Sequence, residues 1–238
     1  MEHILITGAN RGLGLEFTRQ YLERGAHVFA GCRQPTAASS LHHLQARFSQ
    51  RLSVVALDVA NADAIRTAHD TVHAQTESLD VLINNAAIYS TRGSDEPLEQ
   101  LGNLSFEDAL TVLRVNAVGP LLVAQQFLGL LQAGRRAKLI NISSGYGSVS
   151  ANTAGFPYYY SASKAALNMF MRSLAADTKR WGITTVLLDP GWVSTDMGGP
   201  GAPLVPQEAV AAMIRVIDAL TPRYNGRFLT WRGDEQDW

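Results

Sequence analysis

The chain has 238 residues, of which 46% are hydrophobic, and a formal net charge of −1. This length and composition are typical of one globular domain with a sizeable core, and they exclude a fibrous or largely disordered chain. The basic residues are scattered along the chain, so we expect no nucleic acid and no anionic membrane as partner, but small molecules. The single cysteine, Cys32, excludes an internal disulfide and a cysteine-cluster zinc site.

The chain begins directly with an apolar, strand-like segment, without a basic start, a long apolar stretch or a small-residue cleavage site. We therefore expect no export signal and no membrane span, and we predict a cytoplasmic protein. No internal repeat or linker marks a second domain, so a single dinucleotide-binding domain is expected over residues 1–238.

Short β-rich segments alternate with longer helix-like segments along the whole chain. The predicted strands are residues 3–7, 27–31, 53–57, 80–84, 138–143, 184–189 and 226–231. The predicted helices are roughly residues 13–24, 62–76, 106–131, 160–181 and 206–220. This alternation predicts an α/β fold, a single-domain Rossmann fold with a doubly wound parallel sheet of about seven strands and helices on both faces. The Gly/Pro-rich stretch before the last helix belongs to a predicted substrate loop at about residues 191–206.

A glycine-rich turn, TGANRGLG, follows the first predicted strand and leads into a helix. Gly8, Gly12 and Gly14 permit a tight turn and let backbone amides approach a pyrophosphate at the helix N-terminus. A bare tight turn is the alternative, and the position between an N-terminal strand and a helix disfavours it. The turn therefore predicts a dinucleotide site.

The residues near the end of the second predicted strand indicate which dinucleotide binds. A free ribose is usually held by an acid at this position, whereas a 2′-phosphate needs cations. Here the strand is followed by Arg33, and Arg11 lies within the glycine turn. Two guanidinium groups can hold a phosphate bidentately, so we predict NADP(H); the alternative is that both arginines are merely solvated surface groups.

Three consecutive tyrosines precede a lysine in YYYSASK, and only Tyr160 has Lys164 four residues downstream, on the same helical face. Reduction of a ketone requires a group that exchanges a proton near neutral pH. All six histidines lie at or before His73, so none accompanies the later strand ends. We expect the Lys164 ammonium to lower the pKa of Tyr160, which makes this tyrosine the predicted acid–base group.

Two further positions complete a predicted proton-transfer site. The strand before the tyrosines ends in Ser143 and Ser144, and either hydroxyl can hydrogen-bond a substrate oxygen or simply cap a turn. Pro120 has no amide hydrogen, so in a continuous helix the carbonyl of Asn116 loses its partner and can hold a water. The alternative for the proline is a plain helix kink.

These motifs together resemble the classical short-chain dehydrogenase/reductases. The resemblance covers almost the whole chain through TGANRGLG, LDV at 57–59, NNAA at 84–87, Asn116, NISS, YSASK and PGWVSTDM at 190–197. More narrowly, YYYSASKAALNM, PGWVSTDMGGPGAPL and GRFLTWRG resemble the C-factor and sniffer-type carbonyl reductases. The family pattern favours Ser144 over Ser143, although Ser144 precedes Tyr160 by sixteen positions, more than in many members.

The resemblance implies roles for individual residues. Asp58 is expected at the adenine, Asn85 at the neighbouring ribose, Lys164 also at the nicotinamide ribose and Thr195 at the carboxamide. Ala87 departs from the family, which usually has glycine there. The implied catalytic residues are Asn116, Ser144, Tyr160 and Lys164. The implied cofactor-binding residues are Gly8, Asn10, Arg11, Gly12, Leu13, Gly14, Arg33, Asp58, Val59, Asn85, Ala86, Ala87, Tyr160, Lys164, Pro190, Gly191, Val193 and Thr195.

The predicted function is an NADPH-dependent oxidoreductase that transfers hydride between nicotinamide and a small-molecule carbonyl or alcohol. The alternative is an NADP(H)-binding regulatory or signalling protein of the C-factor type, which the proton-transfer set disfavours because a binder does not need it. A Rossmann-like methyltransferase is disfavoured by Arg11, Arg33 and the tyrosine–lysine pair.

Three weaker signals leave their alternatives open. His69 and His73 have helical spacing, but no third ligand lies at useful spacing, so no metal site is predicted. Trp192 either lines a substrate pocket or anchors its loop. The small and apolar residues of AALNMFMRSLAA suit a homodimer interface and core burial equally well.

Overall fold

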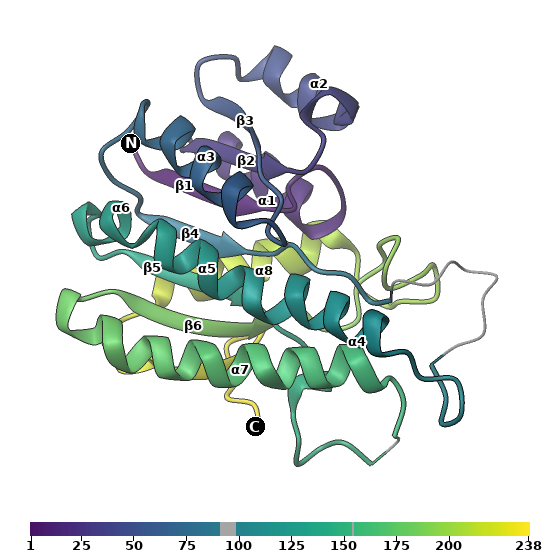
Figure 1. The fold of residues 1–238 in the computed structure, drawn as a ribbon. Helices are drawn as coiled ribbons and strands as arrows, with labels where there is room; N and C mark the ends of the chain where they lie inside the picture. Colours follow the sequence, from purple (N-terminus) through teal and green to yellow (C-terminus); the bar gives the residue numbers. More distant parts are fainter. Residues whose placement is uncertain (91–98, 154) are drawn as a thin grey trace.

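The computed structural model describes residues 1–90, 99–153 and 155–238 (Figure 1). It contains one parallel sheet with strand order β3-β2-β1-β4-β5-β6-β7. The strands are β1 (His3–Thr7), β2 (His27–Cys32), β3 (Leu52–Ala56), β4 (Val81–Asn84), β5 (Lys138–Ile142), β6 (Thr184–Asp189) and β7 (Arg227–Thr230). The helices are α1 (Gly12–Glu23), α2 (Ser39–Arg47), α3 (Ala62–His73), α4 (Phe106–Leu113), α5 (Gly119–Gln126), α6 (Leu128–Ala133), α7 (Tyr158–Thr178) and α8 (Pro206–Ala219).

The strand order reverses between β1 and β4. The chain builds outward from β1 to β3, then returns so that β4 pairs with the other side of β1. Ile4 is thus in register with Val28 on one side and Val81 on the other. All carboxyl ends of the strands reach one edge, and the switch point between β1 and β4 is where such sheets bind ligands. Figure 1 shows α4, the start of α7 and the loop after β6 at this edge.

Helices cover both faces of the sheet, which confirms the predicted doubly wound architecture (Figure 1). Successive strand residues point to opposite faces, so Ile4 and Ile6 pack with Phe17 of α1, whereas Leu5 packs on the other face with Leu167 of α7. All five side chains are fully buried or nearly so. Burial of each such side chain contributes about 1.5–3 kcal/mol, so the two layers fix the strand register on which the edge depends.

Two elements differ from the sequence prediction. Helix α2 was not predicted, because only Leu41 and Leu44 of this short, polar segment are buried and no side chain caps its N-terminus. The predicted helix over 106–131 is instead three α-helices, with a π-helical turn at Arg114–Val118 between the first two.

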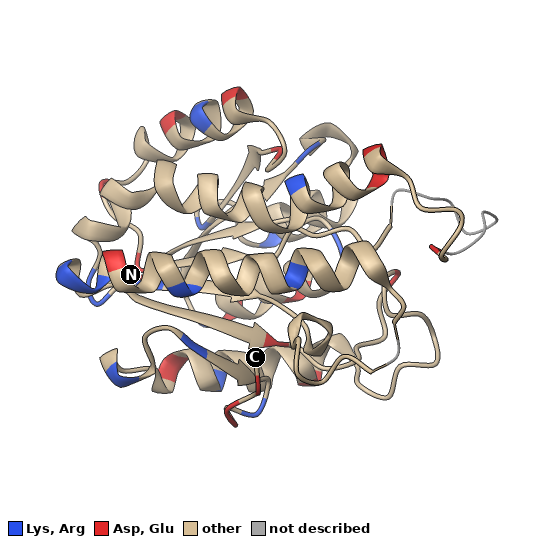
Figure 2. Ribbon diagram, turned by 60° about the horizontal axis from the view of Figure 1, so that its bottom comes forward, with Lys and Arg blue, Asp and Glu red and all other residues tan. Residues whose placement is uncertain are grey.

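Charged residues are spread over the described elements without a block of one sign, as Figure 2 shows. Among the described residues, no helix is long and apolar enough to cross a membrane.

Candidate active site

A cavity of about 800 Å³ opens at the carboxyl edge of the sheet. Its walls come from the start of α1, the segments after β4 and β5, the start of α7 and the loop after β6. The lining residues are Leu13, Tyr89, Ser144, Gly145, Tyr146, Ser148, Ala151, Asn152, Thr153, Tyr160, Asp189, Pro190, Gly191, Trp192, Val193, Thr195, Met197 and Gly198. Residue 154 lies outside the described residues.

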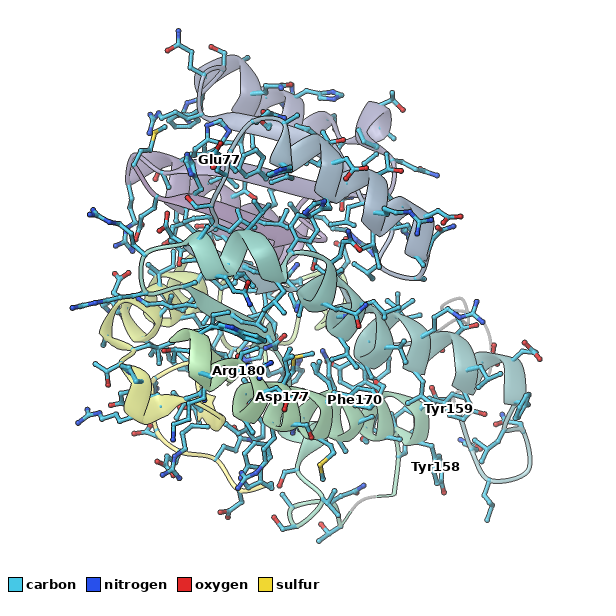
Figure 3. The ribbon with its side chains drawn as sticks, turned by 60° about the vertical axis from the view of Figure 1, so that its left-hand side comes forward. Glu77, Tyr158, Tyr159, Phe170, Asp177 and Arg180 are labelled. Carbon is cyan, nitrogen blue, oxygen red and sulfur yellow. The ribbon has the colours of Figure 1, made fainter. Side chains whose placement is uncertain are left out.

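The three consecutive tyrosines at the start of α7 have different surroundings. Tyr158 is 37% exposed, and the Tyr159 hydroxyl accepts a hydrogen bond from the Ser105 backbone amide. Figure 3 shows both side chains at the start of α7. Only Tyr160, which is 8% exposed, lines the cavity. The spacing argument and the cavity therefore select the same tyrosine.

The two serines after β5 are equally distinct. The Ser143 hydroxyl is buried and donates to the Asn168 side-chain oxygen at 2.6 Å, so it joins β5 to α7. Ser144 lines the cavity, and its hydroxyl accepts from the Tyr146 backbone amide at 3.2 Å, which starts a short 3₁₀ turn. Of the two hydroxyls, only that of Ser144 faces the space beside Tyr160.

Lys164 lies one turn after Tyr160 and is almost completely buried. Its ammonium donates to the backbone carbonyl of Ile142 at 2.8 Å and lies 5.5 Å from the centre of the Tyr160 ring. Burial lowers the pKa of Lys164 to about 8, and the negative charge of Asp189 opposes this shift. Lys164 therefore titrates close to neutral pH.

The expected lowering of the Tyr160 pKa is wrong for the protein without cofactor. Burial raises the pKa of Tyr160, a hydrogen bond with Ser144 lowers it, and the charge of Asp189 raises it further. The physical reason is that desolvation of the phenolate outweighs the hydrogen bond from Ser144 that favours it. Tyr160 is consequently a neutral hydroxyl at neutral pH, able to donate a proton.

Asn116 lies within the π-helical turn rather than in a continuous α-helix. The amide of Gly119 bonds to the carbonyl of Arg114, five residues back, immediately before Pro120. The Asn116 side chain is buried, exchanges two hydrogen bonds with the backbone of Ile88 and donates to Ser163 of α7. Asn116 thus ties the segment after β4 to the helix that carries Tyr160.

The glycine turn packs too closely for side chains. Gly8 and Gly12 have positive φ angles of 66° and 54°, a region that favours glycine. A Cβ at Gly8 would lie 2.8 Å from the Cα of Ala86, and one at Gly14 would lie 2.3 Å from the Gly8 carbonyl oxygen. Glycine is therefore required at these positions for the turn to pack against the segment after β4 at the N-terminus of α1.

Thr7, which the sequence analysis did not single out, connects the glycine turn to the segment after β4. Its hydroxyl accepts from the amides of Asn85 and Ala86, both at 3.0 Å. The Asn85 side chain donates to the carbonyls of Thr7 and Gly8 at 2.9 and 3.2 Å. The sequence signal that could have identified Thr7 was a hydroxyl side chain at the last position of the largely apolar, buried strand β1. Ala87 follows this junction and is half-buried.

The two arginines predicted at the 2′-phosphate lie in different surroundings. Arg11 forms an ion pair with Asp196 in the loop after β6, and both side chains are well exposed. Arg33 is exposed directly after β2, and we find no polar partner for it within the described ranges. The amide of Ala9 bonds to the carbonyl of Gly31 at 2.9 Å, which brings the glycine turn against the end of β2.

The remaining predicted cofactor positions occupy the same edge. Asp58 follows β3, and its carboxylate accepts from the amide of Ala60 at 2.9 Å. Val59 is buried against Gly119, and Asn10 is exposed in the glycine turn. A Cβ at Gly12 would lie 3.6 Å from the Thr195 methyl group, so the loop after β6 reaches the start of α1.

A model of the short chain dehydrogenase family matches residues 2–202. The chain belongs to this family. The chain is also 43% identical to C-signal of Myxococcus xanthus over 163 residues, covering 68% of this chain and 95% of the relative.

Two solved structures share the complete fold. The NADPH-bound carbonyl reductase from chicken fatty liver is 33% identical, with a TM-score of 0.91 and coverage of 100% and 99% of the two chains. The carbonyl reductase Sniffer of D. melanogaster has the same identity and TM-score, with both chains fully covered. These comparisons confirm the resemblance to the short-chain dehydrogenases and to the C-factor and sniffer-type carbonyl reductases.

Several cavity residues of this short-chain dehydrogenase were not predicted from the sequence. Asp189, Tyr89 and Tyr146 each lie within a few residues of a strand end, which was the only signal for them. Trp192 lines the cavity, and its ring nitrogen donates to the Gly198 carbonyl at 2.7 Å, so it both lines the pocket and anchors its loop. Among the described residues, no group of three potential ligands could hold a metal ion.

Proposed function

We propose that the chain is an NADPH-dependent carbonyl reductase that also oxidises alcohols in the reverse direction. The observation that carries this proposal is the meeting of Ser144 and Tyr160 in one cavity at the carboxyl edge, with buried Lys164 behind them. The family membership and the NADPH-bound carbonyl reductase of the same fold support it.

The residues at the strand switch point fit a dinucleotide. Gly8 and Gly14 leave a close-packed cradle at the N-terminus of α1, where backbone amides attract a pyrophosphate. Leu13, Pro190 and Thr195 line the cavity that would hold the nicotinamide end. When bound, NADPH supplies the hydride that reduces the carbonyl carbon. Asp58, Val59, Asn85, Ala86 and Ala87 would contact the adenosine half.

The chain's own residues would handle the substrate oxygen and its proton. The neutral Tyr160 hydroxyl would donate a proton to this oxygen, while the Ser144 hydroxyl would orient it. Lys164, whose pKa lies at about 8, would supply positive charge as the phenolate forms. Asn116 would hold the segment after β4 in place and order the water that returns the proton.

The preference for NADPH over NADH would come from Arg11 and Arg33. Both guanidinium groups are exposed on neighbouring parts of the edge, and the short loop at β2's end, Arg33 to Pro35, contains no acid that would repel a 2′-phosphate. The pairing of Arg11 with Asp196 is exposed and therefore weak, so a phosphate can replace it.

The experiment measures NADPH and NADH oxidation with a panel of aldehydes, ketones and quinones, for the wild type and for Tyr160→Phe. We expect turnover with NADPH, and its loss in Tyr160→Phe with cofactor binding retained. Tyr158→Phe is the matched control, because this neighbouring tyrosine is absent from the cavity lining. Tight NADPH binding without turnover on any carbonyl would instead favour a regulatory protein, a role that the intact proton-transfer set disfavours.

Three further predictions accompany this function. The substrate loop comprises residues 191–206, the protein is cytoplasmic, and the apolar surface of α7 is available to a homodimer. Met169 of α7 is 64% exposed, which is consistent with a partner copy on this helix. Sedimentation velocity of the purified chain tests the oligomeric state.

A further inference from the structure

The wall of the catalytic cavity contains one charged side chain among the described residues, that of Asp189. This aspartate is the last residue of β6 and precedes the Pro190–Gly191 pair. It shares the cavity with Ser144 and Tyr160. A substrate in contact with these two hydroxyls would therefore meet the Asp189 carboxylate in the described wall, while the positive charge of Lys164 is buried behind Tyr160.

The carboxylate of Asp189 is held in place by local structure. One of its oxygens accepts from the Gly191 amide at 3.0 Å, and the other faces the chain segment after Ser144. A Cβ added to Gly145 would lie 3.3 Å from this second oxygen. The carboxylate is thus fixed beside the residue that follows Ser144, next to the expected position of the substrate.

The electrostatic influence of Asp189 reaches both partners of the proton-transfer pair. Burial raises the pKa of Tyr160, and the charge of Asp189 adds to that increase. Burial lowers the pKa of Lys164, and the charge of Asp189 opposes that decrease. The charge that acts on Tyr160 and Lys164 also acts on a charged substrate held against Tyr160, because such a substrate would occupy the cavity that Asp189 and Tyr160 both line.

Aromatic rings form the remaining substantial part of the wall. The Tyr89 ring lies 5.0 Å from the Tyr160 ring, and the Tyr146 ring lies 6.1 Å from it, edge-on. These rings add apolar contact surface to the wall and no formal charge. The carboxylate of Asp189 therefore sets the charge of the described cavity lining.

We propose that Asp189 is a specificity-determining residue that selects substrates by charge. It favours uncharged carbonyl compounds and those with a basic nitrogen, and it disfavours those with a carboxylate near the reacting carbonyl. This inference rests on the proposed carbonyl reduction and adds a substrate class to it.

The test compares three benzaldehydes of similar size: 4-carboxybenzaldehyde, its amide 4-formylbenzamide, and 4-(dimethylaminomethyl)benzaldehyde. The quantity measured is kcat/KM of each charged aldehyde divided by that of the amide, for the wild type and for Asp189→Asn. This ratio cancels any general loss of activity in the variant. We expect the wild type to disfavour the carboxylate by about tenfold and Asp189→Asn to reduce that difference to about twofold. The preference for the amine should fall in parallel.

Asp177→Asn is the matched control, because this exposed aspartate lies near the far end of α7 (Figure 3) and the change removes the same net charge. Its ratios should equal those of the wild type. Identical kcat/KM ratios in the wild type and Asp189→Asn would overturn the proposal. If, in addition, kcat/KM fell equally for all three aldehydes, the carboxylate would act on Tyr160 or on the cofactor and not on substrate choice.

A binding measurement separates this proposal from the proposed function. Calorimetry of 4-carboxybenzaldehyde and 4-formylbenzamide binding is carried out with NADPH present, on Tyr160→Phe and on Tyr160→Phe/Asp189→Asn. Absence of turnover on the amide by the wild type would refute the carbonyl reductase assignment alone. The charge preference stands if Asp189→Asn tightens binding of the carboxylate relative to the amide, and it fails if the two affinities keep their ratio.

Discussion

The guanidinium group of Arg11 lies 3.1 Å from the carboxylate of Asp196, which joins the glycine turn to the loop after β6. The two side chains are 64% and 75% exposed, so the pair contributes little to the stability of the fold. The pair matters for cofactor binding, because Arg11 is also a proposed ligand of the 2′-phosphate. A bound phosphate and Asp196 would contend for the same cation.

Asp196→Asn should therefore tighten NADPH binding relative to NADH. The variant leaves Arg11 free for the phosphate, and we expect the ratio of the two dissociation constants to change by about two- to fivefold, in keeping with a weak exposed pair. Fluorescence titration of both cofactors measures it, with Asp177→Asn as the surface control. An unchanged ratio in Asp196→Asn, together with a normal ratio in Arg11→Gln, would exclude Arg11 from phosphate recognition.

Gly14→Ala should abolish cofactor binding and destabilise the fold. The new methyl group would lie 2.3 Å from the Gly8 carbonyl oxygen and 2.5 Å from the Asn85 side-chain nitrogen, so the backbone must shift. We expect a loss of about 1–3 kcal/mol in the free energy of unfolding, measured by urea denaturation. Gly129→Ala is the matched control: it lies in α6 with open space around it and should stabilise by about 0.5–1 kcal/mol. Normal NADPH binding by Gly14→Ala would contradict the proposal that the glycine turn at the N-terminus of α1 binds the dinucleotide.

Replacing Ser143 should lower the stability of the protein, whereas replacing Ser144 should lower its activity. Ser143→Ala leaves the buried Asn168 oxygen without its donor, so we expect a loss of about 1–3 kcal/mol in stability. Ser144→Ala should change stability by less than about 1 kcal/mol but lower kcat by about 100-fold, since the substrate oxygen loses a donor. Urea denaturation and steady-state kinetics measure the two effects. The reverse pattern would assign the substrate contact to Ser143.

Lys164 should make the protein more stable as the pH rises above about 8. Its pKa falls from 10.5 to about 8 on folding, so between these values the unfolded chain binds more protons than the folded one. The free energy of unfolding therefore increases with pH in this window and is flat, for this group, below it. Relative to Lys164→Met, the wild type should gain about 2 kcal/mol between about pH 7.5 and about pH 9.5.

Lys179→Met serves as the control for this pH dependence, because Lys179 is exposed at the end of α7. Its stability should follow the wild type at every pH. Buried Tyr21, whose pKa is raised, is common to all three proteins and cancels in the difference. Parallel pH curves for the wild type and Lys164→Met would show that the ammonium is not desolvated.

The sequence predicted the sheet well because its information is local. Each buried strand is a short apolar run, and the seven runs reappear in the structure with ends that differ by at most one residue. The tight turn at Gly8 and Gly14 could also be predicted from the sequence, because a strand, a glycine turn and a helix follow one another directly in the chain. The choice of Tyr160 among three tyrosines needed only the spacing to Lys164.

Features that depend on contacts between distant segments could not be predicted. The raised pKa of Tyr160 comes from burial among residues of several elements, which no spacing reveals. Asn116, within the π-helical turn, bonds to Ile88 and Ser163, which lie 28 and 47 residues away in the chain. Asp189 lines the cavity because β6 pairs with β5, and this pairing of distant segments could not be predicted from the residues around Asp189.

The pairing of β1 with β4 has a consequence for how the protein assembles. Thr7 and the amides of Asn85 and Ala86 meet across a separation of 78 and 79 residues, so the junction forms only after a long loop has closed. The nucleotide cradle is thus absent from either half of the sheet alone. A ligand that bridges this seam would act as a clamp, slowing the separation of the halves and protecting their shared amides from hydrogen exchange.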